Sequence, residues 1–414
     1  MNKRFLFILT ISVFCLLALG SLISFAEDNA KATTKDGILV IESEDGNFRY
    51  QLDSRLYIDF ATYDEDESVI DLHSGSELRR MRLAFKVVLW KDWLAEFDVD
   101  FSENSVGIKD AWVGYQGLDN TLFKVGNFRS PFCLEELTSS RYSPFIERSL
   151  ADAFATGRLI GVSVSEWGSF WQASAGYFNQ EAGDIDEVEA ENSDESGSFI
   201  GRLSVAPINS DNNVIHLGAA FATRSTDAFS TSFRYRSYDE TKISKIRLLD
   251  TGKIKDSDYT TLLGLEGAIQ FGSLHLQGEY ITANVYRLEE SGKPDACFDG
   301  GYAYVSFFLT GDHHTYDVTA GEFGRLVPEK EFGAIEVLAR YSWINLNDEE
   351  ANIMGGEGKD WTFGLTWYFN ANVKMLVNYT IVDHDENATA AGTYEVPEDG
   401  FDYNILAVRF LVTI

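Results

Sequence analysis

The feature that most constrains the fold is a two-residue alternation of apolar and polar side chains, repeated in many segments of the chain. In residues 48–63, Leu52 and Phe60 fall on one face and Asp53 and Arg55 on the other. Because side chains alternate across a strand, each such segment predicts a strand with one apolar and one charged face. These strands suit a barrel with lipid outside and water inside, although a half-buried sandwich strand has the same period. The length of the segment favours the barrel.

Residues 1–26 have the pattern of a cleaved secretory signal. Lys3 and Arg4 precede an apolar run at residues 5–23, and a small-x-small site ends at Ala26. An uncleaved membrane anchor is the alternative, since the apolar run approaches the length of a membrane span. No later stretch has about 18 consecutive apolar residues, so no further spanning helix is expected.

The chain is strongly acidic, with a formal net charge of −31. Removal of the signal takes away two basic residues and leaves −33. Nucleic-acid binding needs a basic surface, so no nucleic-acid partner is expected. A uniformly negative field would also repel anions from a pore, so the local distribution of charge decides what a pore could pass. Cys133 and Cys297 remain after the signal, and we expect both to be unpaired.

A segment of about thirty residues within 121–164 interrupts the alternation, and a loop of that length is more often functional than decorative. It is rich in large apolar residues, namely Phe132, Leu134, Leu137, Phe145, Ile146, Leu150 and Phe154. Four arginines occur along it, Arg129, Arg141, Arg148 and Arg158, with Glu135, Glu136, Glu147 and Asp152 as candidate counter-charges. We expect the segment to fold into a cavity and to present cations there.

This segment resembles the phosphate-selective porin O and P family of outer-membrane channels. The resemblance rests on K-V-G-N-F-R-S-P-F-x-L-E-E-L-T-S-S-R-Y at 124–142, F-I-E-R-S-L at 145–150 and G-R-L-I-G-V at 157–162. In F-R-Y-R-S-Y-D-E at 233–240, Arg234 and Arg236 match an arginine pair of the family's second inward loop, although Ser237 replaces the usual proline. The resemblance implies a homotrimeric channel in the outer membrane of a Gram-negative-type bacterium.

Short turns and long loops alternate along residues 27–414, as they do between the two rims of an outer-membrane barrel. Counting the alternating segments gives about 16 strands. The expected fold is therefore all-β: a transmembrane antiparallel β-barrel domain over 27–414, with a long constriction loop folded inward. Such a wall leaves an aqueous lumen unless loops fill it.

The charges on two neighbouring strands leave two interpretations open. Arg80, Arg82 and Lys86 share the charged face of one strand, and Glu96, Asp98 and Asp100 share that of the next. A cross-strand ion-pair ladder inside the wall is one explanation. A charge-separated pore wall is the other.

We expect a porin that passes small anions, phosphate or polyphosphate among them, by passive diffusion. Arginine suits phosphate because its planar fork pairs with two oxygens. The expected anion path comprises Lys124, Arg129, Arg141, Arg148, Arg158, Arg234 and Arg236, with Arg80, Arg82 and Lys86 on the wall. The alternative for these arginines is that wall carboxylates neutralise them and they merely hold the loops.

Two other functions are compatible with the sequence. One is a general or cation-preferring porin, as the net charge suggests, and the other is a structural or adhesive barrel that conducts nothing. The chain has no phosphate-binding glycine loop, no G-x-S-x-G elbow and no H-E-x-x-H helix, so we expect no enzyme and no cofactor. His313 and His314 are adjacent without a third ligand nearby, so no metal site is expected.

Overall fold

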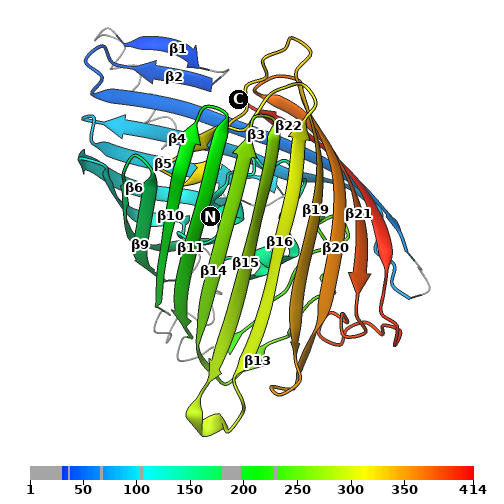
Figure 1. The fold of residues 1–414 in the computed structure, drawn as a ribbon. Helices are drawn as coiled ribbons and strands as arrows, with labels where there is room; N and C mark the ends of the chain where they lie inside the picture. The colour runs from blue at the N-terminus through cyan, green and yellow to red at the C-terminus, as the bar shows by residue number, and fades with distance from the viewer. Residues whose placement is uncertain (1–29, 36–37, 66–68, 103–105, 180–196, 227–230) are drawn as a thin grey trace, which may run out of the picture.

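The computed structural model describes residues 30–35, 38–65, 69–102, 106–179, 197–226 and 231–414. Over these ranges, sixteen antiparallel strands form a closed barrel in which sequence neighbours pair (Figure 1). The ring closes between β3 (Phe48–Asp64) and β22 (Tyr403–Thr413), which pair antiparallel along their length. This confirms the predicted all-β barrel of about 16 strands.

The other barrel strands follow in chain order. They are β4 (Gly75–Leu89), β5 (Trp93–Asp100), β6 (Gly107–Leu118), β7 (Thr121–Arg129), β8 (Arg158–Trp167), β9 (Trp171–Phe178), β10 (Ser198–Ser210), β11 (Asn213–Ser225), β14 (Ser257–Phe271), β15 (Leu274–Arg287), β16 (Ala296–Phe308), β19 (Ala334–Asp348), β20 (Ile353–Tyr368) and β21 (Val373–His384). A hairpin of β1 (Lys31–Lys35) and β2 (Ile38–Glu42) extends the sheet beside the start of β3.

The predicted signal at residues 1–26 lies outside the described residues, so its cleavage stays a prediction. Among the helices of the described ranges, none has the length and apolar character needed to cross a membrane. Cys133 is buried and Cys297 is exposed, and both are free thiols.

The barrel has a polar inside and an apolar outside. On β3, Asp53, Arg55 and Asp59 are buried, whereas Leu52 and Phe60 are exposed. The same arrangement, with charged side chains inside and apolar side chains outside, recurs around the ring. Large apolar side chains are exposed on strand after strand. A soluble protein would leave these side chains in water, but a membrane barrel places them in lipid. The alternation read from the sequence therefore assigns the two faces of the wall.

The connections differ between the two rims. One rim has tight turns at 90–92, 119–120, 168–170, 211–212, 272–273 and 369–372. The same rim also carries one long connection, residues 309–333, which holds the short hairpin β17 (Tyr316–Asp317) and β18 (Glu322–Phe323). We call it the rim loop.

The opposite rim carries most of the long connections. One of them, residues 130–157, contains α2 (Leu134–Leu137) and the 3-10 turn η2 (Leu150–Phe154). Another runs between β11 and β14 and contains β12 (Ser232–Phe233) and β13 (Ile254–Lys255). The short turn η3 (Glu289–Ser291) lies between β15 and β16.

Candidate functional site in the barrel lumen

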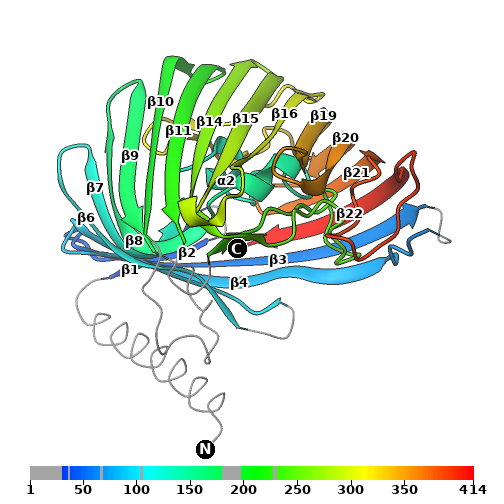
Figure 2. The ribbon, with the colours of Figure 1, turned by 90° about the horizontal axis from the view of Figure 1, so that it is seen from below.

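The connection 130–157, here called the constriction loop, lies inside the ring of strands, where Figure 2 shows α2. Its apolar side chains are almost completely buried, namely Phe132, Leu134, Phe145, Ile146, Leu150 and Phe154. Aromatic contacts fix two of them to their surroundings: Phe154 packs edge-on against Tyr235, and Phe145 against Tyr304. The loop is held inside the lumen by the same burial that stabilises a core, which confirms the predicted inward constriction loop.

Two arginines of the wall bind one carboxylate of the constriction loop. Glu147 accepts hydrogen bonds from Arg79 Nε at 2.7 Å and Nη2 at 3.0 Å, and from Arg409 Nη2 at 2.7 Å. Arg409 lies on β22 and also forms an ion pair with Asp59 of β3 at 2.6 Å. Although burial opposes it, the charges of Arg79 and Arg409 hold the pKa of Glu147 well below its usual range. Glu147 is therefore a charged anchor.

Further contacts attach the constriction loop to the opposite wall. Arg340 of β19 donates from Nη1 to Glu135 Oε1 and from Nη2 to the Glu147 carbonyl oxygen, both at 3.1 Å. Glu279 of β15 accepts the backbone N–H groups of Leu134 at 2.8 Å and Glu135 at 2.6 Å. These are the first N–H groups of α2, which have no partner within a helix. The loop is thus bonded to several strands that lie far apart in sequence.

A cavity of 860 Å³ lies between the constriction loop and the wall formed by β3 to β10. Its lining includes seven basic side chains, Arg55, Lys86, Lys124, Arg129, Arg141, Arg158 and Arg202. It also includes four acidic ones, Glu96, Asp110, Asp119 and Glu322. The local excess of positive charge is opposite in sign to the net charge of the chain. Because a field inside a low-dielectric wall is set by nearby groups, the lumen and the molecule as a whole need not attract the same ions.

Five of the predicted path residues line this cavity: Lys86, Lys124, Arg129, Arg141 and Arg158. Arg141 donates to Asp53 Oδ2 at 3.0 Å, and Arg158 donates from Nη2 to Asp110 Oδ2 at 2.8 Å. Lys124 differs, because its Nζ lies 4.4 Å from the centroid of the Trp112 ring and it forms no ion pair among the described residues. The structure therefore brings these five together, most of them with a carboxylate partner.

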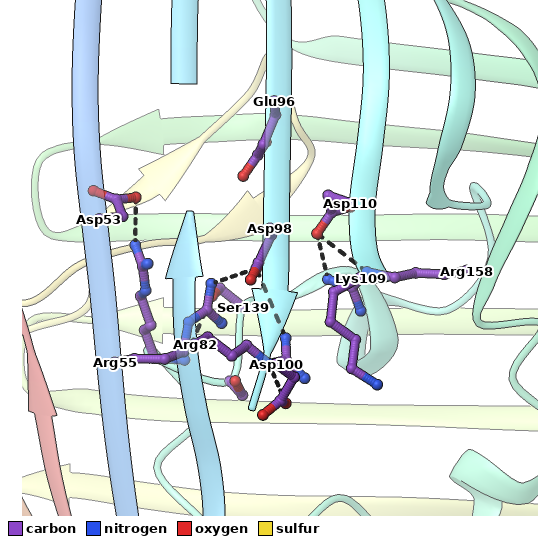
Figure 3. A network of polar contacts seen from close by, with 12 residues as sticks. Asp53, Arg55, Arg82, Glu96, Asp98, Asp100, Lys109, Asp110, Ser139 and Arg158 are labelled. Atoms are coloured by element: carbon purple, nitrogen blue, oxygen red, sulfur yellow. Dashed lines mark hydrogen bonds and ion pairs between the residues drawn. The ribbon is translucent and has the colours of Figure 1, made fainter. Parts of the chain in front are cut away.

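The wall charges form a cross-strand ladder rather than two separated stripes (Figure 3). Arg82 and Asp100 stand opposite each other on β4 and β5, with Nε 2.7 Å from Oδ2. Lys86 and Glu96 are opposite one another in the same register, 3.6 Å apart. Arg55 of β3 reaches Asp98 at 3.3 Å. Directly opposed charges of this kind stabilise a sheet.

The remaining five predicted residues do not line the cavity. Arg82 belongs to the ladder, and Arg80 lies over the ring of Tyr57. Arg148 braces the constriction loop from within, donating to the Glu135 and Glu136 carbonyl oxygens. Arg234 pairs with Asp250, and Arg236 joins the same residue through a backbone bridge. Both are exposed in the connection between β11 and β14.

The structure also adds residues that the sequence reading did not single out. Arg55 and Arg202 line the cavity, and Arg79, Arg340 and Arg409 anchor loops. Alternation places Arg55 and Arg202 on the inward faces of their strands, and this signal could have found them. The inward position of Arg79 could not be predicted from alternation, because a β-bulge shifts the register between Tyr57 and Ile58. The bulge turns both Arg79 and Arg80 inward.

The rim loop folds into the lumen from the rim of tight turns. Arg202 of β10 donates to the Gly321 carbonyl oxygen at 2.7 Å and to that of Ala320 at 3.3 Å. His314 lies 2.9 Å from Glu336 of β19, and its backbone exchanges hydrogen bonds with Gln270 of β14. Thr319, Ala320 and Glu322 of this loop line the cavity. The lumen is therefore narrowed from both rims.

A closed barrel with an apolar outer face and a charged, loop-narrowed lumen is an outer-membrane channel. The sequence profile of the phosphate-selective porin O and P family matches residues 50–414. The chain belongs to this family of channel proteins, and it resides in the outer membrane of a Gram-negative bacterium.

Two relatives in sequence and one solved structure are similar to this chain. An uncharacterized protein of Caulobacter vibrioides is 31% identical over 82% of this chain and 69% of its own. Porin O of Pseudomonas aeruginosa is 27% identical over 85% of this chain and 87% of its own. The structure of OmpT from Vibrio cholerae in its trimer form superposes with a TM-score of 0.54, covering 88% of this chain and 99% of OmpT at 11% identity. At that identity the likeness shows the fold alone.

Proposed function

We propose that this porin passes small anions, with phosphate or polyphosphate among them, by passive diffusion through the cavity between the constriction loop and the wall. The observation that carries the proposal is the basic lining of the cavity, seven cations against four carboxylates, in a chain whose net charge is −31. The description of the family as phosphate-selective supports the choice of phosphate.

The carboxylate partners of the cations suit this function. An arginine held by a single carboxylate keeps further N–H groups of its fork for a passing anion. A channel has to release its ion, so several moderate sites in series serve better than one tight site. Lys124 over Trp112, Arg141 beside Asp53 and Arg158 beside Asp110 would form such a series.

The test is the reversal potential of the purified protein in planar bilayers under a KCl gradient, followed by titration with inorganic phosphate. We expect anion selectivity and a chloride current that phosphate reduces. Cation selectivity would refute the proposal and make the arginines structural. A membrane with inserted protein but no conductance would point to a barrel that is not an open pore.

We also propose a homotrimer, on the grounds that the related fold of OmpT occurs in a trimer form. The mass of the detergent-purified complex, measured by light scattering with the detergent contribution subtracted, tests this. A monomer mass would contradict it.

A further inference from the structure

One carboxylate of the rim loop occupies an unusual position. Glu322 is contributed to the cavity from the rim opposite to the constriction loop, and it faces Lys124 and Arg129 of β7 and Arg202 of β10. Among the described residues it forms no ion pair with any of them, whereas the cavity carboxylates Glu96 and Asp110 are each paired across the wall. Glu322 is thus a carboxyl group in a basic cavity without an ion-pair partner among the described residues.

The two neighbours of Glu322 fix its position. On one side, the carbonyl oxygen of Gly321 accepts from Arg202, and Gly321 has φ +64. A Cβ at this position would lie 2.4 Å from Ser204 Oγ, and the positive φ also favours glycine, so glycine suits this close approach of the loop to the wall. On the other side, Phe323 is buried in a cluster with Leu134, Val214 and Ala268. Since successive side chains of a strand point to opposite sides, burying Phe323 directs Glu322 to the cavity.

We propose that Glu322 is a tethered counter-anion, a specificity-determining residue that competes with permeating anions for Lys124, Arg129 and Arg202 and makes the anion selectivity depend on pH. The inference rests on the proposed anion selectivity. When the carboxylate is charged, it offsets part of the positive field that draws anions in. When it is protonated, this offset is lost and the cavity draws anions in more strongly.

The environment of Glu322 supports titration near neutrality. Burial raises the pKa of Glu322 to about 7, and the charges of Arg129, Arg202 and Lys124 offset only part of that effect. The charged and titratable groups around it are Lys124 and Arg129 of β7, Arg202 of β10 with its partners Glu266 of β14 and His216 of β11, and Tyr316 and Asp317 of its own hairpin. As the pH falls through this range, Glu322 loses its charge and the cavity becomes more positive.

The experiment measures the reversal potential under a KCl gradient at a series of pH values from 5 to 9, for the wild-type chain and for Glu322→Gln. Chloride is the probe because, unlike phosphate, it does not itself titrate in this range. For the wild type we expect the chloride-to-potassium permeability ratio to rise about sevenfold on acidification. Removing one negative charge about 7 Å from the ion in a water-like dielectric favours chloride by about threefold and disfavours potassium by about threefold. Glu322→Gln should show the high ratio at every pH.

Asp119→Asn is the matched control, because it removes the same charge from the lining of the same cavity but at the exposed β6–β7 turn. Asp119→Asn should raise the chloride-to-potassium permeability ratio at all pH values. It should keep the step, which is the rise of this ratio as the pH falls through about 7. A step that survives in Glu322→Gln, or one that Asp119→Asn abolishes equally well, would overturn the inference.

The outcomes separate the role of Glu322 from the proposed anion selectivity. A wild-type protein without any step between pH 6 and 8 overturns the inference even if Glu322→Gln fails to fold. A wild type that prefers cations at every pH refutes the proposed anion selectivity itself, and with it the inference. An anion-selective wild type whose step persists in Glu322→Gln refutes only the role of Glu322.

Discussion

Replacing Glu147 with glutamine should weaken the attachment of the constriction loop to the wall. The side chains of Glu147 and Arg79 are only 10% and 13% exposed, and the change leaves the Arg79 guanidinium without its bidentate partner. Arg409 keeps Asp59, so the loss falls mainly on Arg79, whose other carboxylate, Glu77, is 4.0 Å away. Removing one partner of a buried pair costs about 3–5 kcal/mol, and the retained Asp59 contact places this variant near the lower end, about 3 kcal/mol.

The free energy of unfolding is measured by urea denaturation of the refolded barrel in bilayers, followed by tryptophan fluorescence. Asp256→Asn is the control, since it breaks the Lys293–Asp256 pair, in which both side chains are about half exposed. Exposed pairs contribute little, so this control should be close to the wild type. If Glu147→Gln lost no more stability than the control, the anchoring role assigned to Glu147 would be wrong.

The pH dependence of the stability difference between the wild type and Glu147→Gln follows from the direction in which the pKa of Glu147 is shifted. The pKa of Glu147 is held below the ordinary value by Arg79 and Arg409, so folding is favoured by its ionised form. The contribution of ionised Glu147 to the free energy of unfolding is complete above the unfolded-state pKa of 4.5. It is lost as the pH falls through the lower pKa of the folded state. The stability difference between wild type and Glu147→Gln should therefore be constant at neutral pH and shrink only in acid. A difference that shrinks between pH 6 and 8 would contradict this assignment.

Two further predictions concern the lumen and the lipid face. Arg141→Gln should lower the chloride-to-potassium permeability ratio because it removes a cation from the cavity lining, whereas Arg236→Gln, outside the cavity, should leave the ratio unchanged. Equal effects of the two variants in reversal-potential measurements would contradict the assigned path. Leu265→Arg, at a side chain that is 51% exposed in the middle of β14, should cost about 2–4 kcal/mol in urea unfolding, with Leu265→Ala as the size control. A cost near zero would mean that this face does not lie in lipid.

Much of the barrel could be predicted because alternation is a local property of the chain. Leu52 and Asp53 are neighbours, and their opposite faces follow from strand geometry without any knowledge of the partners. The inward loop was predictable for a similar reason: a long interruption containing Phe132 and Leu150 has to bury them somewhere. The ladder between Arg82 and Asp100 needed the register of two strands, and for that reason the sequence left it as one of two interpretations.

The partners of the loops were beyond such reasoning. Arg340 reaches Glu135, and Arg409 reaches Glu147, across separations of 205 and 262 residues that no periodicity encodes. The β-bulge at Arg79 interrupts the alternation of inward and outward side chains at one point on β4. The rim loop breaks the rule that connections at its rim are short, and Glu322 owes its place in the cavity to packing by Phe323 rather than to any local motif.

The position of Arg409 has a consequence for how the barrel is assembled. Arg409 belongs to β22, which pairs with β3 to complete the ring. The same side chain contacts Asp59 across this seam and Glu147 on the constriction loop. The contact that completes the wall and the contact that holds the loop therefore form together. A chain truncated before β22 would lose both the β3–β22 seam and this contact to the constriction loop.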